Sequence, residues 1–445
     1  MHAGSSGPGH DSWRDWLRSA RAGMDPDRFM RQHAGDKEPF TVIFPGMGPV
    51  HFVATREAAR EILTTPREVL CAPTPNPIEP IVGPESVILT SGAVHRRQRT
   101  LLSPAFHGAQ MREHADGMAR AVVDEIEPWR AGDRVALHAT AQSITLRIII
   151  RTVLGVEAGP RCEAYAVVVS ALMNANTAPL MLLPSLRKNL AGLGPWARLV
   201  RLRTQFDGML SDQIRLGPQC PVTGRGPILT QLLSEAEDDV GAALDAEELQ
   251  QQLRTLVVAG HDTTAAALAW TLYHIHHEPG VRERLTDELC TDPAPEQMAK
   301  MPYLSAVIAE TLRMHPAVPV VLRKLVEPRT ICGVRLSSGE IVGIAVPAVH
   351  FNPELFPDPY RFDADRFLAY RPTPFEYMPF GGGYRRCLGA AFAMYELAVA
   401  VGTMMGMVAL AMPARERRRK PPRSVPRGIA VVPRRDVKLL VTERL

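Results

Sequence analysis

The fold and the chemistry that we expect of this chain follow from one stretch, Phe380-Gly-Gly-Gly-Tyr-Arg-Arg-Cys387-Leu-Gly389. Its three successive glycines lack a Cβ atom, so the backbone can pass close beneath a flat ligand. Cys387 stands where a helix through AAFAMYELAVA is expected to open. The dipole and the free N–H groups of a helix N-terminus favour a thiolate. The stretch therefore predicts a cysteine of lowered pKa that binds a metal.

The surroundings of this cysteine narrow the choice of metal. No second Cys or His stands at the spacing of a zinc site, whereas a single axial thiolate suits haem iron. The stretch resembles the haem-binding loop of the cytochromes P450, whose pattern is Phe-x-x-Gly-x-Arg-x-Cys-x-Gly. The chain fills each place of that pattern, with Phe380, Gly383, Arg385, Cys387 and Gly389. The resemblance implies that Cys387 is the axial ligand of a haem b, in a loop that also includes Gly381.

Composition agrees with a globular protein and excludes several classes. The 445 residues are 46% hydrophobic and carry a formal net charge of +4, too small to indicate nucleic-acid binding. The six cysteines are scattered and make no disulfide scaffold, which favours a reducing cytosol. The N-terminus has no apolar core of a signal peptide. The uncharged run 397–412 is shorter than a membrane span, so we expect a buried helix followed by a turn or strand, and no integral membrane segment.

Periodicity predicts a mainly α protein with small β-sheets (α+β), a single large domain over residues 13–445 after a flexible N-terminus of residues 1–12. The sequence predicts a hairpin over 40–53 and long Pro-rich or Pro/Gly-punctuated loops over 72–85 and 179–195. Expected helices are 55–64, 94–127, 139–154, 160–177, 245–278, 303–314 and a last one from Leu388.

Glu310 and Arg313 stand three residues apart on one helix face and can pair. The segment resembles the Glu-x-x-Arg pair of the cytochromes P450, which implies a buried triad closed by an arginine of a later meander. Arg366 fills that position, although Ala364 stands where the family usually has Pro. The resemblance implies that this triad holds the cysteine loop in place.

One apolar helix is interrupted by residues that disfavour a helix. They lie in the run Ala259-Gly260-His261-Asp262-Thr263-Thr264. A threonine bonded to the carbonyl four residues earlier can open the helix and leave room for water. The segment resembles the acid–alcohol motif of the cytochromes P450. The resemblance implies that Asp262 passes protons from solvent and that Thr263 hydrogen-bonds dioxygen, with Ala259 and Gly260 against the haem. His261 is expected to face away from it.

The resemblance also assigns the cations that hold the two haem propionates. They are His95, Arg99, Arg323 and Arg385. Several positive donors offset two buried carboxylates. Arg96, Arg97, Arg112 and Arg386 are expected on the surface nearest the cysteine, either as a docking face for an acidic redox partner or as a solvated face.

The function implied by the resemblance is that of a haem-thiolate monooxygenase. No flavin motif is present, so electrons are expected from a separate ferredoxin or flavodoxin with its reductase. The expected pocket is almost entirely aliphatic and shows no cation, which favours a terpenoid or steroid over a fatty acid as the small-molecule substrate. Its expected lining, with 428–429 as a further segment, is Ile78, Ile81, Val82, Ile88, Leu172, Asn176, Val257, Ala259, Val318 and Val320.

Three alternatives stay open beside this function. A peroxygenase replaces the acid–alcohol pair, which Asp262 and Thr263 argue against. A P450 that performs coupling, dehydration or isomerisation fits the same motifs. A haem-based sensor needs neither a proton relay nor a substrate-sized pocket. We expect a bacterial, cytoplasmic monomer.

Overall fold

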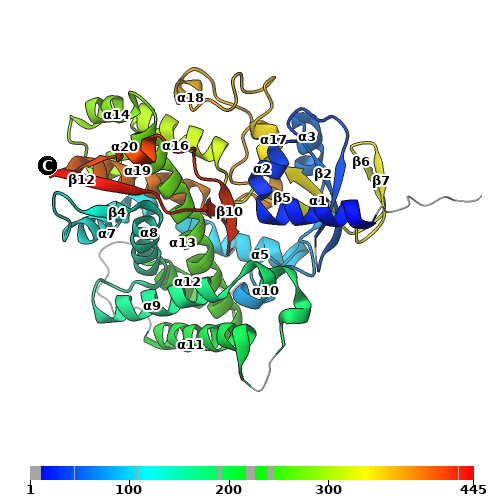
Figure 1. Cartoon of the computed structure of the whole chain (residues 1–445). Helices are drawn as coiled ribbons and strands as arrows, with labels where there is room; N and C mark the ends of the chain where they lie inside the picture. Colours follow the sequence, from blue (N-terminus) through cyan, green and yellow to red (C-terminus); the bar gives the residue numbers. More distant parts are fainter. Residues whose placement is uncertain are drawn as a thin grey trace, which may run out of the picture.

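The computed structural model describes residues 12–44, 46–106, 109–188, 192–216, 226–238, 244–428 and 430–445. The expected flexible stretch 1–12 lies outside these residues, except that Ser12 is the first residue of helix α1. A helical body occupies most of the molecule, and the largest sheet lies at one side of it (Figure 1). This arrangement confirms the predicted mainly α fold with small sheets.

The axis of the helical body is α13 (Ala246–His277), which runs through the centre of Figure 1. It packs against α8 (Leu137–Leu154), α11 (Gly194–Leu216), α16 (Pro302–Met314) and α19 (Ala390–Met407). The Asp245 side chain caps its N-terminus by accepting from the Glu248 N–H at 2.8 Å. The helix ends just before Pro279, which cannot donate a hydrogen bond to a further turn. These local signals explain why the prediction of 245–278 was correct.

The main sheet has five strands in the order β1-β2-β8-β5-β3, and only β2 and β8 run parallel. Two further hairpins, β6–β7 and β10–β11, and a sheet of β4-β12-β9 complete the strands of the described residues. Their bounds are β1 (Phe40–Phe44), β2 (Gly48–Val53), β3 (Leu70–Cys71), β4 (Arg134–Ala136), β5 (Val320–Leu325), β6 (Arg329–Ile331), β7 (Val334–Leu336), β8 (Ile341–Ala345), β9 (Val408–Ala411), β10 (Ser424–Arg427), β11 (Ala430–Pro433) and β12 (Lys438–Arg444).

The remaining helices surround these elements. They are α1 (Ser12–Met24), α2 (Pro26–Arg31), α3 (Arg56–Thr64), α4 (Glu79–Val82), α5 (Gly92–Leu102), α6 (Ala109–Glu113), α7 (Ala115–Ile126), α9 (Pro160–Ala175), α10 (Ala178–Leu182), α12 (Ile228–Asp238), α14 (Val281–Leu289), α15 (Pro295–Met298), α17 (Val346–His350), α18 (Asp365–Ala369), α20 (Ala414–Arg417) and the 3₁₀ turns η1 (Pro104–Phe106), η2 (Pro184–Leu186) and η3 (Gly383–Arg385).

Several predicted boundaries were wrong. The single helix expected over 94–127 is divided into α5, η1, α6 and α7, because Pro104 cannot donate the hydrogen bond that would continue α5. The loops expected over 72–85 and 179–195 contain the single turns α4, α10 and η2, each with a proline in its first turn. The last long helix begins at Ala390 rather than Leu388, and α20 follows it.

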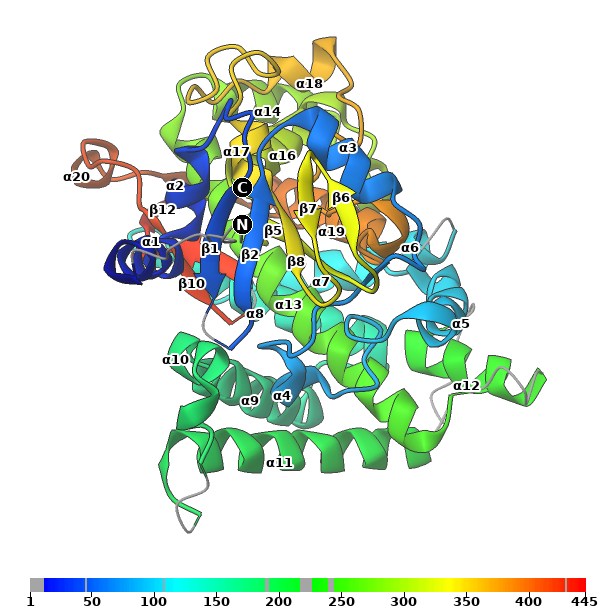
Figure 2. The same cartoon turned by 90° about the vertical axis from the view of Figure 1, so that its right-hand side faces the viewer.

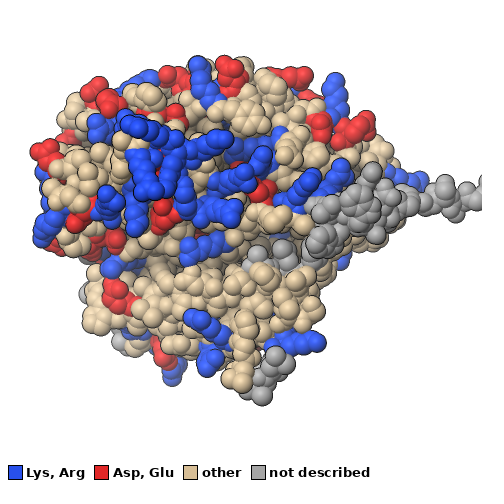
Figure 3. Space-filling model, viewed as in Figure 1, with Lys and Arg blue, Asp and Glu red and all other residues tan. Residues whose placement is uncertain are grey.

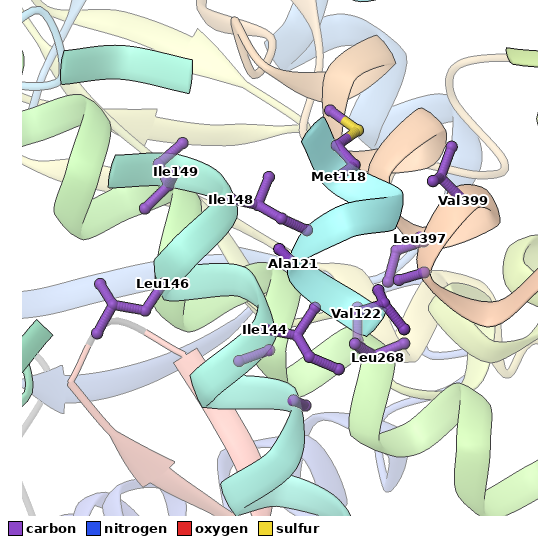
Figure 4. Close-up of a cluster of buried hydrophobic side chains, with 14 of the residues drawn as sticks. Met118, Ala121, Val122, Ile144, Leu146, Ile148, Ile149, Leu268, Leu397 and Val399 are labelled. Atoms are coloured by element: carbon purple, nitrogen blue, oxygen red, sulfur yellow. The ribbon is translucent and has the colours of Figure 1, made fainter. Parts of the chain in front are cut away.

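The main core lies where α7, α8, α13 and α19 meet (Figure 4). Its side chains are mostly aliphatic and almost completely buried, and removing them from water stabilises the fold. Figure 4 labels Met118, Ala121, Val122, Ile144, Leu146, Ile148, Ile149, Leu268, Leu397 and Val399. Gly260 belongs to the same contact, because a Cβ there would lie 2.7 Å from Ile149 Cδ1.

Within the described residues one helix, α19, is long and apolar enough to cross a membrane by composition. Of that stretch, 61% is buried inside the protein, as expected of a core helix. The run 397–412 continues from this helix into strand β9, as its length predicted. The helix directly follows the cysteine loop, so core packing sets the position of that loop.

A second constraint on the loop comes from an ion pair in α16. Glu310 and Arg313 are both fully buried. Arg313 Nε and Nη2 donate to the two Glu310 oxygens at 2.7 and 2.9 Å. Arg366 Nε, from α18, lies 3.4 Å from Glu310 Oε1, so the structure brings the three expected residues together. Buried charges of this kind are tolerated only when every group has a partner.

Arg313 reaches the cysteine loop through one histidine. Its Nη1 donates to the His350 carbonyl at 2.8 Å, and the His350 ring Nδ1 lies 3.0 Å from the Arg313 carbonyl. The other ring nitrogen accepts from the Met378 N–H at 2.9 Å, two residues before Phe380. Burial lowers the pKa of His350 to about 3, so the ring stays neutral and can donate at one nitrogen and accept at the other. This histidine ties the ion pair to the start of the loop.

The substitution Arg313→Leu is expected to lower the free energy of unfolding by about 3–5 kcal/mol, because it leaves the Glu310 carboxylate buried without its main partner. The check is chemical denaturation followed by circular dichroism. Arg361→Leu is the control, since Arg361 is two-thirds exposed and its one ion pair with the described residues is to Asp363; it should change stability by less than about 1 kcal/mol. Equal losses in the two variants would contradict the role given to the buried pair.

Candidate functional site

The cysteine loop is held by its own backbone and by the helix α3. The Cys387 N–H donates to the Phe380 carbonyl at 2.9 Å, and the Arg386 N–H donates to Gly383. A Cβ at Gly383 would lie 2.4 Å from the Leu63 carbonyl oxygen, and φ at this residue is +65°. A Cβ at Gly382 would meet the Leu63 side chain. The structure thus explains two of the three glycines by the close approach of α3, which the sequence did not reveal.

The expected lowering of the Cys387 pKa was wrong for the free thiol. Burial raises the pKa of Cys387 and outweighs the Gly389 backbone N–H and the nearby Arg386 and Arg99, which lower it. The reason is partly that α19 begins three residues later, so the thiol is not at the helix terminus itself. Cys387 is nevertheless exposed to solvent. An accessible sulfur among desolvating protein atoms suits an atom that a metal ion deprotonates directly on binding.

Four basic side chains from three parts of the chain gather beside this loop. The pKa of His95 is lowered to about 3, first by burial and then by the charges of Arg385, Arg99 and Arg323. Arg323 is 7% exposed, and burial followed by the charge of Arg385 lowers its pKa to about 10. The structure therefore brings together the four residues expected at the propionates, from α5, β5 and the cysteine loop.

Within the described residues, these four basic side chains, three arginines and the neutral His95, have no anion of the protein beside them. Arg99 donates to the Arg386 carbonyl, Arg323 to Leu322 and Gly382, and Arg385 to three carbonyls of residues 87–90. Within the described part of the chain, no carboxylate lies within ion-pair distance of any of the four. Buried guanidinium groups without a counter-ion are costly, and two carboxylates of a ligand would relieve that cost. The residues present fit a haem with two propionates.

The loop over 82–90, which Arg385 contacts, is fixed from the other side by α13. Gln251 and Gln252 side chains accept from the Glu85 and Val87 N–H groups at 2.8 and 3.0 Å. Arg254 donates to the Val82 carbonyl at 3.1 Å. A Cβ at Gly83, where φ is +88°, would lie 2.2 Å from Gln251 Oε1. The Pro-rich segment is therefore an ordered wall rather than a free loop.

The middle of α13 carries the predicted acid and alcohol. Thr263 Oγ1 donates to the Ala259 carbonyl at 2.7 Å, the bond that the sequence suggested, but the helix continues through it without a break. Asp262 is 1% exposed, and neither of its carboxylate oxygens has a hydrogen-bond partner in the described residues. Burial raises the pKa of Asp262 to about 6. The acid is therefore shielded from solvent and poised to exchange a proton near neutral pH.

Arg427, at the end of β10, is a candidate site residue that no motif of the sequence indicated. It is the one charged group that lowers the pKa of Asp262 against the effect of burial. Its Nη2 donates to Asn174 Oδ1 in α9 at 2.6 Å. The next residue, Gly428, lies so close that a Cβ there would be 2.5 Å from Asp262 Oδ2. The sequence offered one signal, since Arg427 directly precedes the expected pocket segment 428–429; Ile429 itself lies outside the described residues.

Two neighbours in this helix have structural roles. His261 Nδ1 lies 3.0 Å from Thr145 Oγ1 in α8, so the ring is directed toward α8. Burial lowers the pKa of His261 to about 3. Gly260, expected against the haem, is explained by its contact with Ile149. Both residues therefore contribute to the packing of α13 against α8.

The expected pocket residues differ in exposure. Val318 is 40% exposed, and Asn176 is buried with its side-chain Nδ2 unpaired. Ile81, Val82, Leu172 and Val257 are fully buried, whereas Ile78, Ile88, Ala259 and Val320 are half-buried.

Of the four arginines expected on the surface near the cysteine, three are exposed: Arg96, Arg112 and Arg386. Arg97 is different, because it pairs with the buried Glu248 at 2.5 Å. Glu248 lies 151 residues later in the chain, so no local pattern indicated this pair.

Comparison with known proteins places the whole chain in one group. The family model "Cytochrome P450" matches residues 15–440. "Putative cytochrome P450 135B1" of Mycobacterium bovis is 34% identical over 381 residues, which are 83% of this chain and 78% of the relative. "Putative cytochrome P450 138" of the same organism is 30% identical over 380 residues, 85% of this chain and 83% of the relative.

Solved structures show the same fold at lower identity. The retinoic acid-bound cyanobacterial CYP120A1 has a TM-score of 0.81 at 23% identity, and the comparison covers 96% of each chain. The cytochrome P450DA heme domain has a TM-score of 0.81 at 21% identity and covers 98% of this chain and 97% of its own. With its cysteine loop, its buried ion pair and these relatives, the chain belongs to the cytochrome P450 family of monooxygenases, oxidoreductases that hold haem through an axial cysteine thiolate and use O₂ and electrons from a redox partner.

Proposed function

We propose that this P450 inserts one oxygen atom of O₂ into an apolar substrate of medium to large size, with Cys387 as the axial ligand. The observation that carries the proposal is the group of basic side chains beside Cys387 that have no carboxylate partner in the described residues, together with a buried acid and an alcohol in α13. A haem-based sensor has no use for a buried, unpartnered acid of raised pKa. When bound, the haem iron supplies the activation of dioxygen.

The residues of the chain hold the cofactor and manage the proton. His95, Arg99, Arg323 and Arg385 would hold the propionates as hydrogen-bond donors. Asp262, whose pKa lies near 6, would accept and release a proton at its carboxylate. Thr263 donates to Ala259, which leaves lone pairs on Oγ1 to accept a hydrogen bond. Arg427 would set how readily Asp262 gives up its proton, because a nearby positive charge favours the carboxylate.

The aliphatic character of the expected pocket supports a terpenoid or steroid as the substrate. Arg427 supports a second candidate, an apolar carboxylic acid such as a fatty acid. The sequence showed no cation for an acid headgroup, but the structure places Arg427 beside Asn174 and Asp262. A guanidinium group at this position can pair with a carboxylate.

For electron delivery we propose a separate ferredoxin or flavodoxin with its reductase, which would dock by opposite charge on the exposed Arg96, Arg112 and Arg386. Arg99 Nη1 donates to the Arg386 carbonyl at 2.7 Å, so this surface contacts the cysteine loop directly. We further propose that the protein works in the cytoplasm as a monomer.

The ligand assignment is tested by a ferrous–CO difference spectrum. The wild type is expected to show the red-shifted Soret band of a thiolate ligand, and Cys387→Ala is expected to lose it. Cys290→Ala, a change at another exposed cysteine, should keep the band. An unchanged spectrum of Cys387→Ala would remove this residue as the ligand.

The same sample tests the substrate class by titration with terpenes, steroids and fatty acids. A low-to-high-spin change with terpenes or steroids is expected, and a change with fatty acids alone would select the second candidate. Product analysis with a surrogate redox pair then separates hydroxylation from coupling, dehydration or isomerisation. Oxygen use no higher than background with every ligand would contradict a monooxygenase.

Thr263→Ala is expected to divert reducing equivalents to peroxide, because the substitution removes the hydroxyl that directs protons at the site. The measurement is the ratio of product to NAD(P)H consumed, which should fall several-fold. Thr271→Ala is the matched control: this residue lies two turns later in α13 and makes the same bond, to the Ala267 carbonyl at 2.8 Å. Equal coupling in Thr263→Ala and wild type would remove Thr263 from the proton path.

Asp262→Asn is expected to lower turnover and yet to raise stability at pH 8. The pKa of Asp262 is raised from 3.8 to about 6, so above pH 6 the folded state holds a carboxylate that burial disfavours. This costs about 3 kcal/mol at pH 8, and the cost shrinks as the pH falls through 6 and vanishes below 4. The amide removes the cost, so thermal unfolding should show a stabilisation that is larger at pH 8 than at pH 5.

The control for this variant changes the same electrostatic balance in the opposite direction. Arg427→Gln removes the cation that favours the carboxylate and should lower stability at pH 8 more than at pH 5. A stability change of Asp262→Asn that does not depend on pH would show that the carboxylate is not disfavoured by burial.

A further inference from the structure

A short segment near the C-terminus determines the sign of the net charge of the protein. Residues 415–438 contain ten Lys and Arg against two acidic residues. Without this segment the chain has 41 basic and 45 acidic residues, a net charge of −4 instead of +4. Figure 3 shows the corresponding cluster of basic side chains on one face, in the region of α20 and the nearby end of β10 in Figure 1. A general excess of arginine would have spread these residues over the chain.

The fold joins two parts of this segment into one surface. The Arg434 N–H donates to the Arg423 carbonyl at 2.7 Å, so the turn after β11 lies beside the loop before β10. The exposed basic residues of this surface, here called the α20 surface, are Arg415, Arg417, Arg418, Arg419, Lys420, Arg423 and Arg434. Ser424 lies 3.3 Å from Asp27 in α2, where the exposed Arg28 extends the surface.

The two acidic residues of the segment do not neutralise the α20 surface. Asp436 accepts from the backbone N–H groups of His138 and Ala139, at the start of α8. Glu416 pairs with Arg419 at 2.7 Å and with Arg435. Among the described residues, Arg415, Arg418, Lys420, Arg423 and Arg434 have no carboxylate within ion-pair distance.

The α20 surface is separate from the face proposed for electron delivery. In Figure 2, α20 lies at one edge of the molecule, and α5 and α6 lie at the opposite edge. Arg96 and Arg112 belong to those two helices. A redox partner bound near Cys387 therefore does not explain the α20 surface.

The chemistry of the surface indicates its occupant. Specific protein interfaces have an apolar or aromatic centre inside a polar rim. No large hydrophobic side chain is exposed between residues 412 and 438, as far as these are described. The surface offers the guanidinium groups of its arginines, which bind phosphate in two-point contacts, and the ammonium group of Lys420. An extended array of phosphates suits it better than a folded acidic protein.

Between the two common arrays of phosphates, the charge of the remaining molecule favours a bilayer. A nucleic acid extends past the protein and meets other faces, and the chain outside the segment has a net negative charge. A membrane contacts one face only, and anionic headgroups attract each nearby basic residue by about 1 kcal/mol.

We propose that the α20 surface docks this P450 on the headgroups of an anionic lipid bilayer. The contact is peripheral and electrostatic, so it needs no spanning helix and weakens as salt screens the charges.

The test is sedimentation of the full-length, haem-loaded protein with vesicles of phosphatidylcholine alone or with 30% phosphatidylglycerol (about one lipid in three, a typical anionic fraction). Binding is expected only to the anionic vesicles in low salt. The variant R415Q/R418Q/K420Q/R434Q should bind more than about 100-fold more weakly, about 5-fold for each charge removed. The control R120Q/R329Q/R335Q/R371Q removes the same charge from exposed positions elsewhere and should bind like wild type.

Three results would overturn the proposal. They are equal binding to neutral and anionic vesicles, equal losses in the two quadruple variants, and displacement of the protein from anionic vesicles by a short DNA duplex at the same phosphate concentration. The last would identify a nucleic acid as the preferred array. The CO spectrum of every variant should stay that of wild type, so a failure here is distinct from a failure of the proposed catalytic function.

Discussion

The position of the reactive cysteine depends on one buried ion pair far from it in sequence. Glu310 and Arg313 have no exposed surface, and Arg313 also donates to the carbonyls of His350 and Pro359. A pair of this kind adds little net stability, because desolvation offsets most of the attraction. Its effect is to specify position: Nε, Nη1 and Nη2 of Arg313 all donate to acceptors of the protein, and the hydrogen-bonded series Arg313, His350, Met378 ends at the cysteine loop. An apolar replacement could fill the same volume without specifying where that loop lies.

Several groups of the candidate site lower the stability of the folded chain. Arg323 is buried and Arg385 half-buried among carbonyl groups. Within the described residues neither has an anion beside it, and the buried Asp262 has no hydrogen-bond partner. Each of these groups raises the free energy of the folded chain, and each becomes useful only with a bound cofactor or a proton to transfer. Proteins tolerate such groups at functional sites because the remaining core is large enough to offset them. Here that core is the junction of α7, α8, α13 and α19 (Figure 4).

Different turns of helix α13 contact or carry different parts of the site. Its first turns, with Gln251, Gln252 and Arg254, fix the wall over 82–90. Its middle carries Asp262 and Thr263, and its last turns are buried in the core. Arg385 contacts the same wall from the cysteine loop. The wall is therefore held between the two elements that carry the acid and the thiol, so a shift of either changes the shape of the pocket.

The family, the helical fold and the local motifs were predictable from the sequence, because Cys387, Glu310 with Arg313, and Asp262 with Thr263 are recognisable at short spacing. The predicted helix boundaries were wrong near prolines such as Pro104, because the effect of a proline depends on the exact turn that it occupies. The contacts between distant residues are visible only in the tertiary structure. They join Arg427 to Asn174 across 253 positions, Arg97 to Glu248 across 151, and His350 to Met378. The tertiary structure also reversed the expected pKa shift of Cys387 and showed that Asp262 is shielded from solvent. Burial and charge at a point in space depend on residues from the whole chain, and no local pattern contains them.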